Sequence, residues 1–291
     1  MVQEAIGSVW AQSYKAFELI VVDDGSDDGT AGELAKYGTS LRLVSRQRSG
    51  VAAARNYGFS IAHGRYLAFL DSDDLWARKK LEIQTAFIEE HPEIQICQTD
   101  EIWIRNGARV NPKIKHQKPS GEVFRRSLEL CLVSPSAVMM RKELFNRVGG
   151  FDENFPVCED YDLWLRIAVG HPIPLIPIAL VIKRGGHADQ LSHSLWGMDR
   201  YRVQSLRKLL HSGVAGEKRE WALDALRRKV SILCQGAKKR GKQHELAAYE
   251  GILAEFVQER IDVGGADSPI CERQGIPSAD ARALDGLGSA R

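Results

Sequence analysis

The 291-residue chain lacks the features that mark membrane-spanning, secreted and nucleic-acid-binding proteins. It contains no run of eighteen apolar residues, so the sequence predicts no membrane-spanning helix. Its first residues do not show the basic-then-apolar pattern of a secretory signal. A net charge of +2 is too small to indicate a nucleic-acid partner. With 44% hydrophobic and 27% charged residues, the composition is that of an ordinary globular protein with a sizeable core.

Cysteines are few, and their spacing carries no metal or disulfide pattern. The five cysteines are an odd number, with no Cys-x-x-Cys pair and no histidine-rich spacing near them. They are Cys97, Cys131, Cys158, Cys234 and Cys271. This pattern predicts reduced thiols and a cytoplasmic location, and it argues against a disulfide framework or a zinc site.

The rest of the chain is organised around residues 66–76, where an apolar run of strand length ends in three carboxylates. Asp71, Asp73 and Asp74 follow Tyr66-Leu-Ala-Phe-Leu70 directly. Carboxylates at the end of a buried strand are costly unless a cation neutralises them. Oxygen ligands at this spacing suit Mg²⁺ or Mn²⁺ shared with a phosphate. A strand followed by an acidic helix N-terminus explains the same residues without a metal, because Asp is favoured there by capping and by the helix dipole.

The first half of the chain alternates helix and strand patterns. Asp-Gly turns, β-branched runs and apolar stripes predict, in order, a helix over 2–13, a strand over 17–22, a helix over 27–37, a strand over 41–45, a helix over 50–63 and the acidic strand. Gly64 is expected to close the helix that precedes the acidic strand. Strands separated by short crossover helices imply parallel pairing, as in nucleotide-binding α/β half-domains.

The second half continues with mixed elements and then changes character. The patterns predict a helix over 77–91, a strand over 95–104, a polar loop over the site at 106–120, a helix over 122–132, a strand over 137–140, a helix opening at Cys158 and a strand region over 172–183. Apolar residues three and four apart over 223–237 and 246–256 predict two helices that pack as a hairpin. The basic cluster Lys238-Lys239-Arg240 at their junction is interpreted as a solvated turn rather than a lipid contact. From Gly264 onward the composition predicts disorder.

Five motifs in one order resemble the family 2 glycosyltransferases. The first three are Phe-Glu-Leu-Ile-Val-Val-Asp-Asp-Gly-Ser at 17–26, Gly50-Val-Ala-Ala-Ala-Arg-Asn-Tyr-Gly58 and Gly64-Arg-Tyr-Leu-Ala-Phe-Leu-Asp-Ser-Asp-Asp74. The last two are Val148-Gly-Gly-Phe-Asp152 and Cys158-Glu-Asp-Tyr-Asp-Leu-Trp-Leu-Arg166. Any one motif alone is a weak signal, whereas the ordered set is specific. The resemblance covers residues 1–210.

The resemblance implies a fold, a reaction and partners. The fold is GT-A: α/β, Rossmann-like, with a mixed, mostly parallel sheet flanked by helices. A transferase domain over 1–210 is followed by a helical hairpin at 211–262 and a disordered tail at 263–291. The reaction moves a sugar from a UDP-sugar or another nucleotide-diphosphate sugar, with Mn²⁺ or Mg²⁺ and with inversion, to a glycan or glycolipid acceptor. By analogy the role is polysaccharide or glycolipid assembly in the cytoplasm, with peripheral contact at the inner membrane surface.

The resemblance assigns the donor-side residues. Asp73 is expected to be the principal metal ligand, with Asp71 facing the ribose or the water shell of the metal. Asp74 is expected to cap the following helix instead. Asp24, with Asp23 beside it, matches a position that hydrogen-bonds a uracil-type base, although turn chemistry alone explains an Asp there. Arg55 matches an arginine near the nucleotide, and an exposed helix arginine is nearly as good an interpretation.

The acceptor side needs a base, because an inverting transfer removes the proton of the acceptor hydroxyl. Asp160 matches the catalytic aspartate of the family, and the neighbouring Glu159 offers a like charge that can raise a carboxyl pKa. Acidity at a helix N-terminus explains the pair without chemistry. Trp164 has the spacing of a core residue, although it could also stack on a sugar. His187 matches a position that contacts the metal or the diphosphate in some members.

One departure from the family concerns the start of the chain. Members normally begin with an apolar strand that ends in a Pro/Asn-type turn against the nucleotide, whereas this sequence starts inside the helix that should follow. We expect the native protein to start some 15 or more residues upstream. If it does not, a degenerate domain that binds without catalysing becomes the favoured interpretation.

Two other protein classes share single motifs with this chain. A phosphoacceptor receiver module also has an acidic pair after a Val-Val strand, but it would be complete near 120 residues and leaves Glu159-Asp160 unexplained. A haloacid-dehalogenase-like phosphatase also uses Asp-x-Asp after a strand, but it places its nucleophile near the N-terminus. Neither class predicts the five ordered motifs.

Overall fold

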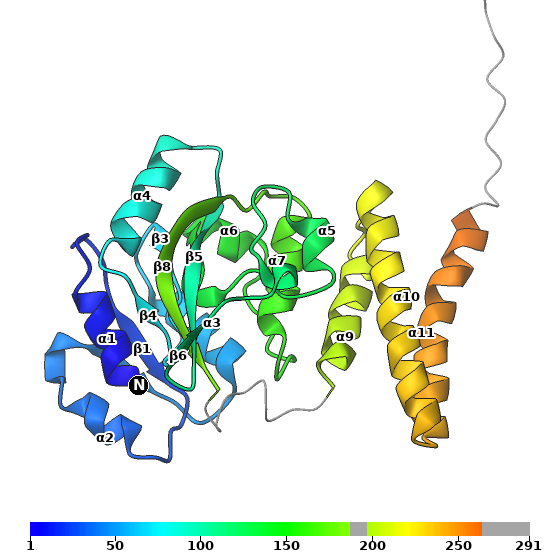
Figure 1. Cartoon of the computed structure of the whole chain (residues 1–291), viewed down its shortest axis with the longest axis horizontal. Helices are drawn as coiled ribbons and strands as arrows, with labels where there is room; N and C mark the ends of the chain where they lie inside the picture. The colour runs from blue at the N-terminus through cyan, green and yellow to red at the C-terminus, as the bar shows by residue number, and fades with distance from the viewer. Residues whose placement is uncertain (187–196, 264–291) are drawn as a thin grey trace, which may run out of the picture.

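The structure is a computed structural model that describes residues 1–186 and 197–263. His187, Cys271 and the predicted tail from Gly264 therefore lie outside the described residues. Figure 1 shows a central sheet with α1, α2 and α4 on one side and α5, α6 and α7 on the other. This α/β arrangement confirms the expected fold class.

The first half of the chain folds in the predicted order, with shorter elements. They are α1 (Val2–Trp10), β1 (Ile20–Asp23), α2 (Thr30–Ala35), the 3₁₀ turn η1 (Gly38–Ser40), β2 (Arg42–Ser45), α3 (Val51–Ile61) and β3 (Tyr66–Leu67). The expected closure of α3 by Gly64 is wrong. The helix ends at Ile61, the next residue Ala62 is extended with φ −76° and ψ 143°, and Gly64 is not among the residues with positive φ. An extended residue stops the helix there without a left-handed glycine.

The second half of the described chain contains the remaining elements. They are β4 (Leu75–Trp76), α4 (Lys80–Glu90), β5 (Ile96–Arg105), β6 (Ala108–Val110), η2 (Ile114–His116), α5 (Phe124–Ser127), η3 (Pro135–Ala137), β7 (Val138–Arg141), α6 (Lys142–Arg147), α7 (Glu159–Ala168), β8 (Leu175–Gly185), α9 (Met198–His211), α10 (Gly216–Lys239) and α11 (Gln243–Val263). The helices α6 and α9 have no counterpart in the sequence predictions.

Strand pairing departs from the expected mostly parallel sheet. Among the described residues, β1 pairs with β2 in parallel, and a second sheet has the order β3-β7-β5-β8-β4 with β6 paired to β5. In this second sheet only β5 and β8 run parallel, while the other pairs are antiparallel. Among the predicted strands that follow one another in the chain, only β1 and β2 are joined by a helix and also paired in parallel. The strand β3 instead finds its partner in β7, which arrives from the opposite direction much later in the chain.

The segment expected as an open loop at 106–120 contains a β-hairpin, so that prediction is wrong in part. Asn106 and Gly107 have φ angles of 49° and 78°, and β6 turns back on the end of β5 with Arg105 paired to Ala108. Two residues with positive φ make the tight turn whose twist matches that of antiparallel strands. The Asn-Gly pair is a hairpin signal that the two prolines of the segment, Pro112 and Pro119, obscured.

The larger sheet is buried on both faces. In β7, Val138 and Met140 join a cluster with α7, whereas Met139 joins a second cluster with α1 and α4. In β5, Ile96 and Cys97 divide in the same way. Because successive side chains of a strand point to opposite faces, this alternation places helices against both sides of the sheet. The sheet is thereby a rigid support for the turns at its edge.

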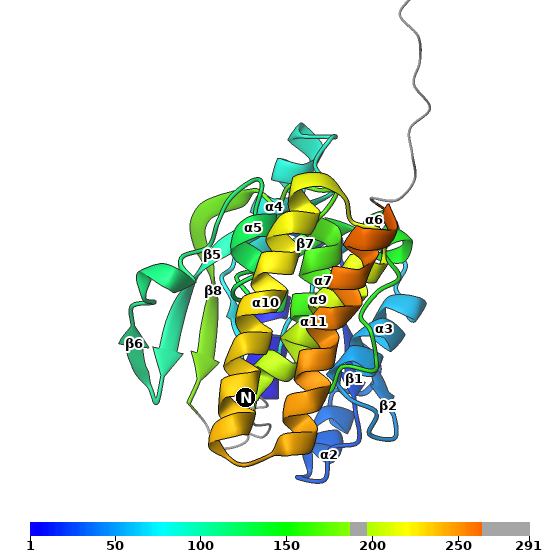
Figure 2. The same ribbon diagram turned by 90° about the vertical axis from the view of Figure 1, so that its right-hand side faces the viewer.

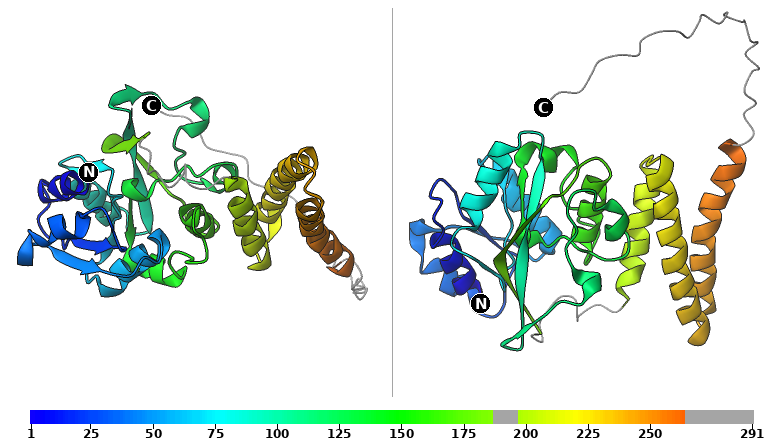
Figure 3. Two further views of the ribbon diagram at one scale, coloured as in Figure 1. Left: turned by 90° about the horizontal axis from the view of Figure 1, so that it is seen from below. Right: turned by 45° about the horizontal axis from the view of Figure 1, so that its top comes forward.

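The predicted helical hairpin is present as α10 and α11 (Figure 2). Its expected core positions on α10, Leu223, Leu226, Val230, Leu233 and Ala237, are all buried. The buried side chains of α9 and α10 form one cluster with those of α7. Figure 3 shows α9, α10 and α11 at the opposite end of the molecule from α1 and α2. No helix of residues 1–186 and 197–263 is long and apolar enough to cross a membrane. The boundaries of the three predicted domains stay a prediction.

A buried lysine should make stability depend on pH. Lys80 is fully buried, donates to Gln84 Oε1 at 2.7 Å and lies 4.2 Å from the centre of the Trp76 ring. Burial lowers its pKa from 10.5 to about 7. Between these values the unfolded chain holds a proton that the folded chain has released. The free energy of unfolding should therefore rise with pH, by up to about 1.4 kcal/mol per pH unit.

Urea unfolding of the native chain and of Lys80→Met between pH 7 and pH 9 checks this prediction. We expect Lys80→Met to lose that positive slope and the exposed neighbour variant Lys79→Met to keep it. Measurements stop at pH 9 because burial raises the pKa of the Cys97 thiol to about 11, which adds a slope of opposite sign above that pH. Equal slopes in all three proteins would contradict the assignment to Lys80.

Candidate active site

The acidic turn after β3 brings three carboxylates together. One oxygen from each of Asp71, Asp73 and Asp74 lies within 4.8 Å of the other two, which is a spacing that can hold a metal ion. The turn is fixed by its backbone: Asp74 N donates to Asp71 O at 3.0 Å, and Asp71 N donates to Ser136 Oγ at 3.1 Å. Ser136 belongs to η3, directly before β7, so this segment holds the start of the turn in place.

Asp74 does not cap the following helix, contrary to expectation. The next element is the strand β4, and the Asp74 Oδ1 atom accepts the backbone N–H of Arg184 in β8 at 2.9 Å. Asp74 is 1% exposed, and its Oδ2 atom has no hydrogen-bond partner. Burial, with the charge of Asp71 next in size, raises the pKa of Asp74 to about 7. An orphaned buried oxygen in a set of oxygen-only ligands fits a hard divalent cation.

Arg55 joins the acidic turn to the second acidic motif. Its guanidinium donates to Asp71 Oδ1 at 2.6 Å and to Glu159 Oε1 at 2.8 Å, and its side chain is only 12% exposed. The exposed helix arginine considered from the sequence is thus excluded. Glu159 opens α7, so this one cation ties α3, the acidic turn and α7 together. The pairing is a contact between residues 104 positions apart. Whether Arg55 also contacts a nucleotide stays a prediction.

Removing Arg55 should destabilise the fold. We expect Arg55→Met to lower the free energy of unfolding by about 3–5 kcal/mol, because the carboxylates of Asp71 and Glu159 lose the cation that compensates their burial. Urea unfolding at neutral pH measures the loss. The double variant Arg55→Met/Glu159→Gln should recover part of it, and Arg65→Met, at an exposed ion pair with Glu89, should cost less than about 1 kcal/mol. A loss in Arg55→Met no larger than in Arg65→Met would contradict the bridging role.

Asp160 faces a cavity, whereas its neighbour Glu159 does not line it. The cavity has a volume of about 220 Å³, and its wall includes Asp160, Cys131, Ser134, Lys183 and Trp103. The Asp160 Oδ1 atom accepts the backbone N–H of Tyr161 at 2.7 Å, and Oδ2 accepts the Cys131 thiol at 3.3 Å. Burial, and after it the contact with Asp160, raises the pKa of the Cys131 thiol well above 9.0. The thiol therefore stays protonated.

The sequence predicts that like charge in the Glu-Asp pair raises a carboxyl pKa, and in the structure this effect falls on Glu159. Burial, with Asp160 next in size, raises the pKa of Glu159 to about 7, even though Arg55 opposes the shift. Glu159 is 7% exposed. Its buried position beside a guanidinium fits a residue that holds α7 in place, and the open position of Asp160 fits a group that meets a substrate.

Lys183 and Arg184 are site residues that sequence reasoning missed. Burial alone would lower the pKa of Lys183, but nearby carboxylates more than offset this effect and raise it; they belong to Glu101, Asp74, Asp71 and Asp160. Lys183 thus lies within electrostatic reach of both the acidic turn and Asp160. Arg184 Nε donates to the Asp73 backbone O. The sequence signal that could have identified them is the pair of basic residues at the end of an apolar strand. This strand, β8, ends beside the acidic turn.

Asp23 is the last residue of β1, and Asp24 is the first residue of the turn that follows. Asp23 is buried, and its Oδ1 atom accepts Ser26 N at 3.1 Å, which makes it the turn-forming residue. Asp24 reaches the start of α3, where its two oxygens accept Ser49 N at 3.0 Å and Gly50 N at 2.7 Å. Gly25 between Asp24 and Ser26 has a φ of 74°, and a Cβ there would lie 2.8 Å from Arg48 N. The nucleotide role of both aspartates stays a prediction.

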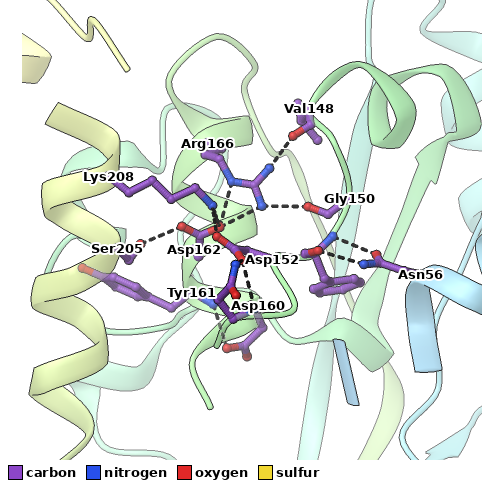
Figure 4. A network of polar contacts seen from close by, with 12 residues as sticks. Asn56, Val148, Gly150, Asp152, Asp160, Tyr161, Asp162, Arg166, Ser205 and Lys208 are labelled. Atoms are coloured by element: carbon purple, nitrogen blue, oxygen red, sulfur yellow. Dashed lines mark hydrogen bonds and ion pairs between the residues drawn. The ribbon is translucent and has the colours of Figure 1, made fainter. Parts of the chain in front are cut away.

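A polar network behind Asp160 holds α7 in register (Figure 4). Asp162 is 1% exposed and accepts Arg166 Nε at 2.8 Å and Lys208 Nζ of α9 at 3.0 Å. Arg166 also donates to Gly150 O at 2.7 Å, and Lys208 pairs with Asp152 at 2.6 Å. The Val-Gly-Gly-Phe-Asp motif and the Glu-Asp motif are therefore joined by direct contacts in the fold.

Two further predictions concern single aromatic and histidine residues. Trp164 is 1% exposed and packs with its ring centroid 6.4 Å from that of Phe151, so it is a core residue rather than a sugar platform. His187, expected near the metal or the diphosphate, lies outside the described residues.

Two solved structures share this architecture. TarS of Staphylococcus aureus, residues 1–349 in complex with UDP-GlcNAc, matches with a TM-score of 0.68 and 22% identity over 90% of this chain and 79% of that one. The mannosyltransferase PcManGT of Pyrobaculum calidifontis, in complex with GDP-Man and Mn²⁺, matches with a TM-score of 0.58 and 18% identity over 90% and 83% of the two chains. At these identities the likeness shows the GT-A fold.

The likeness is also found at the level of sequence, in curated relatives and in a family model. An uncharacterized glycosyltransferase of Rickettsia felis is 37% identical over 167 residues, which is 57% of this chain and about a quarter (27%) of the relative. The UDP-Glc:alpha-D-GlcNAc-diphosphoundecaprenol beta-1,3-glucosyltransferase WfgD of Escherichia coli is 31% identical over 63% of this chain and 70% of its own. The model described as "Glycosyl transferase family 2" matches residues 1–149. The chain therefore belongs to glycosyl transferase family 2.

Proposed function

We propose that the chain transfers a sugar from a nucleotide-diphosphate sugar to an acceptor hydroxyl, in a metal-dependent and inverting reaction. The observation that carries this proposal is the bridge of Arg55 between Asp71 and Glu159. It draws the acidic turn toward the helix start that bears Asp160, so a candidate metal site and a candidate base share one region. The pKa of Lys183 is raised both by carboxylates of the acidic turn and by Asp160, which supports the same grouping.

On the donor side, Asp73 and Asp71 would hold Mn²⁺ or Mg²⁺, with Asp74 as the buried third carboxylate. When bound, the metal supplies positive charge for the diphosphate that leaves with the nucleotide. Lys183 adds fixed cationic charge at the same edge and so favours an anionic donor. Arg184 lies beside it and is ion-paired with Glu4 at 2.9 Å. Asp24 and Asp23 would contact the base, and Arg55 would fix Asp71 from behind. A metal and nucleotide-sugar donors in the complexes of PcManGT and TarS support this assignment.

On the acceptor side, Asp160 would accept the proton of the attacking hydroxyl. It lines the cavity, and one of its oxygens is held by the backbone N–H of Tyr161 while the other faces the Cys131 thiol. A carboxylate fixed in this way can take a proton without reorienting. Glu159 and Asp162 would position α7 from either side of Asp160, through Arg55 and through Lys208.

The acceptor would be a glycan or a glycolipid in cell-envelope polysaccharide assembly, met on the cytoplasmic side of the membrane. The name of the Escherichia coli relative, which describes an acceptor linked to diphosphoundecaprenol, supports this class. The transferase unit would comprise residues 1–210, and the helices beyond it would extend the core.

Thermal unfolding with nucleoside diphosphates tests the donor side. UDP, GDP and ADP are added in turn at millimolar concentration, with Mn²⁺ or with EDTA. We expect one nucleotide to raise the unfolding midpoint with Mn²⁺ and much less with EDTA, because a ligand that binds only the folded chain stabilises it. No shift with any nucleotide, or the same shift in EDTA, would contradict a metal-dependent donor site.

A further inference from the structure

Residues 105–118, the end of β5 with β6 and η2, form a surface that we call the basic segment. No acidic residue lies between Glu101 and Glu122. Over the same stretch the segment carries five lysines and arginines, of which Arg105, Arg109, Lys113 and Lys115 are exposed. Figure 2 shows β6 at the outer edge of the sheet, away from α10 and α11. A chain with a net charge of +2 thus concentrates cations on one short segment.

These exposed cations are not neutralised by the protein itself. Within residues 1–186 and 197–263, none of the four takes part in an ion pair, whereas the fifth cation, Lys118, is buried and paired with Glu101 at 3.1 Å. The local field is visible at His116. Burial and then the charges of Lys115, Lys113 and Arg105 lower the pKa of His116. The uncompensated charge is available to an anionic partner.

The tip of the basic segment also carries an exposed apolar side chain. Ile114 is 81% exposed, the highest value among the large hydrophobic side chains of the described residues, and it stands between Lys113 and Lys115. An isoleucine flanked by two lysines can enter the apolar region of a lipid surface while the ammonium groups meet the headgroups.

The basic segment also lies beside the route to Asp160. His116 and Lys118 line the cavity that contains Asp160, and they line a second cavity of about 440 Å³ together with Pro112 and Gln117. Trp103 joins the two cavities, with its ring 5.6 Å from that of His116. A lipid surface bound by Lys113, Ile114 and Lys115 would therefore lie next to residues that line both cavities.

We propose that the basic segment docks the protein on an anionic phospholipid surface through Arg105, Arg109, Lys113 and Lys115, with Ile114 inserted. This inference rests on the proposed function only for its biological setting, namely an acceptor presented at a membrane. The binding itself needs neither donor nor acceptor, so its failure would leave the proposed transfer reaction standing.

Co-sedimentation with vesicles tests the proposal. The full chain is mixed with vesicles of phosphatidylglycerol and phosphatidylcholine in equal parts, or of phosphatidylcholine alone, in 0.1 M salt. We expect binding to the anionic vesicles only, and loss of binding in 0.5 M salt because the charges are then screened. Each lysine near an anionic surface contributes about fivefold in partition coefficient, so Lys113→Gln/Lys115→Gln should bind about 25-fold more weakly. Ile114→Ser should weaken binding by about tenfold.

The second basic cluster of the chain provides the matched control. Lys238 and Lys239, at the end of α10, are also exposed. Lys238→Gln/Lys239→Gln removes the same charge and should change binding by less than about twofold. Equal binding to neutral vesicles, equal weakening in the two double variants, or equally tight binding to soluble polyphosphate at the same phosphate concentration would each overturn the proposal.

Discussion

Asp160→Asn should lower the rate of sugar transfer by about a hundredfold to ten-thousandfold while leaving donor binding unchanged. Asparagine keeps the size of the side chain and can still accept the N–H of Tyr161, but its amide cannot take a proton. The measurement is the initial rate of product formation at saturating donor, with the donor dissociation constant measured separately. A rate effect without a binding effect is the signature of a group that acts in the chemical step.

The neighbouring carboxylate serves as the control for this variant. Glu159→Gln changes a residue that pairs with Arg55 and does not line the cavity. Its effect on the rate should be smaller than that of Asp160→Asn, and it should appear partly as a loss of stability. If Asp160→Asn transfers sugar at the native rate, or if Glu159→Gln is the more damaging of the two, the base is not Asp160.

Asp73→Ala should abolish the metal dependence of donor binding. Loss of a partner that only supports a metal ligand costs about 10–100-fold in affinity, so loss of a direct ligand should cost at least as much. Calorimetry with Mn²⁺ and the nucleoside diphosphate that gives the largest thermal shift measures the change. Without metal, the variant should be at least as stable as the native chain, because one of three neighbouring carboxylates and its repulsion are gone.

A second substitution in the same turn separates the carboxylate from the loop. Ser72→Ala alters an exposed side chain between Asp71 and Asp73 without removing charge. We expect it to retain Mn²⁺-dependent binding within about twofold, as is usual for a surface change away from a ligand. Unchanged binding in Asp73→Ala would remove the metal assignment from this residue, and an equal loss in both variants would point to the loop rather than to the carboxylate.

Local signals made the individual parts of the site predictable. The acidic turn, the Asp-Asp-Gly turn and the helix that starts at Glu159 each follow from a few adjacent residues. The paired helices α10 and α11 follow from their apolar spacing. The Asn106-Gly107 turn was equally readable, since two positive φ angles favour that pair, but the prolines nearby were given more weight.

Non-local contacts could not be predicted in the same way. The pairing of β3 with β7 depends on a strand more than seventy residues later, and no local pattern specifies it. The bridge of Arg55 between Asp71 and Glu159 is another such contact, because an arginine on a helix looks the same whether it is buried or exposed. Lys183 was missed for the same reason: its charge matters only once β8 lies beside the acidic turn.

The central claim is that the acidic turn and Asp160 belong to one working transferase site. Its most direct test is the release of nucleoside diphosphate from nucleotide-sugar donors such as UDP-glucose, UDP-GlcNAc and GDP-mannose. Release is measured with Mn²⁺ and with EDTA. We expect the native chain to release nucleoside diphosphate from at least one donor with Mn²⁺ and not with EDTA, and Asp160→Asn to bind that donor without turning it over. Binding of a donor by the native chain with no release under any condition would contradict the claim and favour a domain that binds nucleotide sugars without catalysing their transfer.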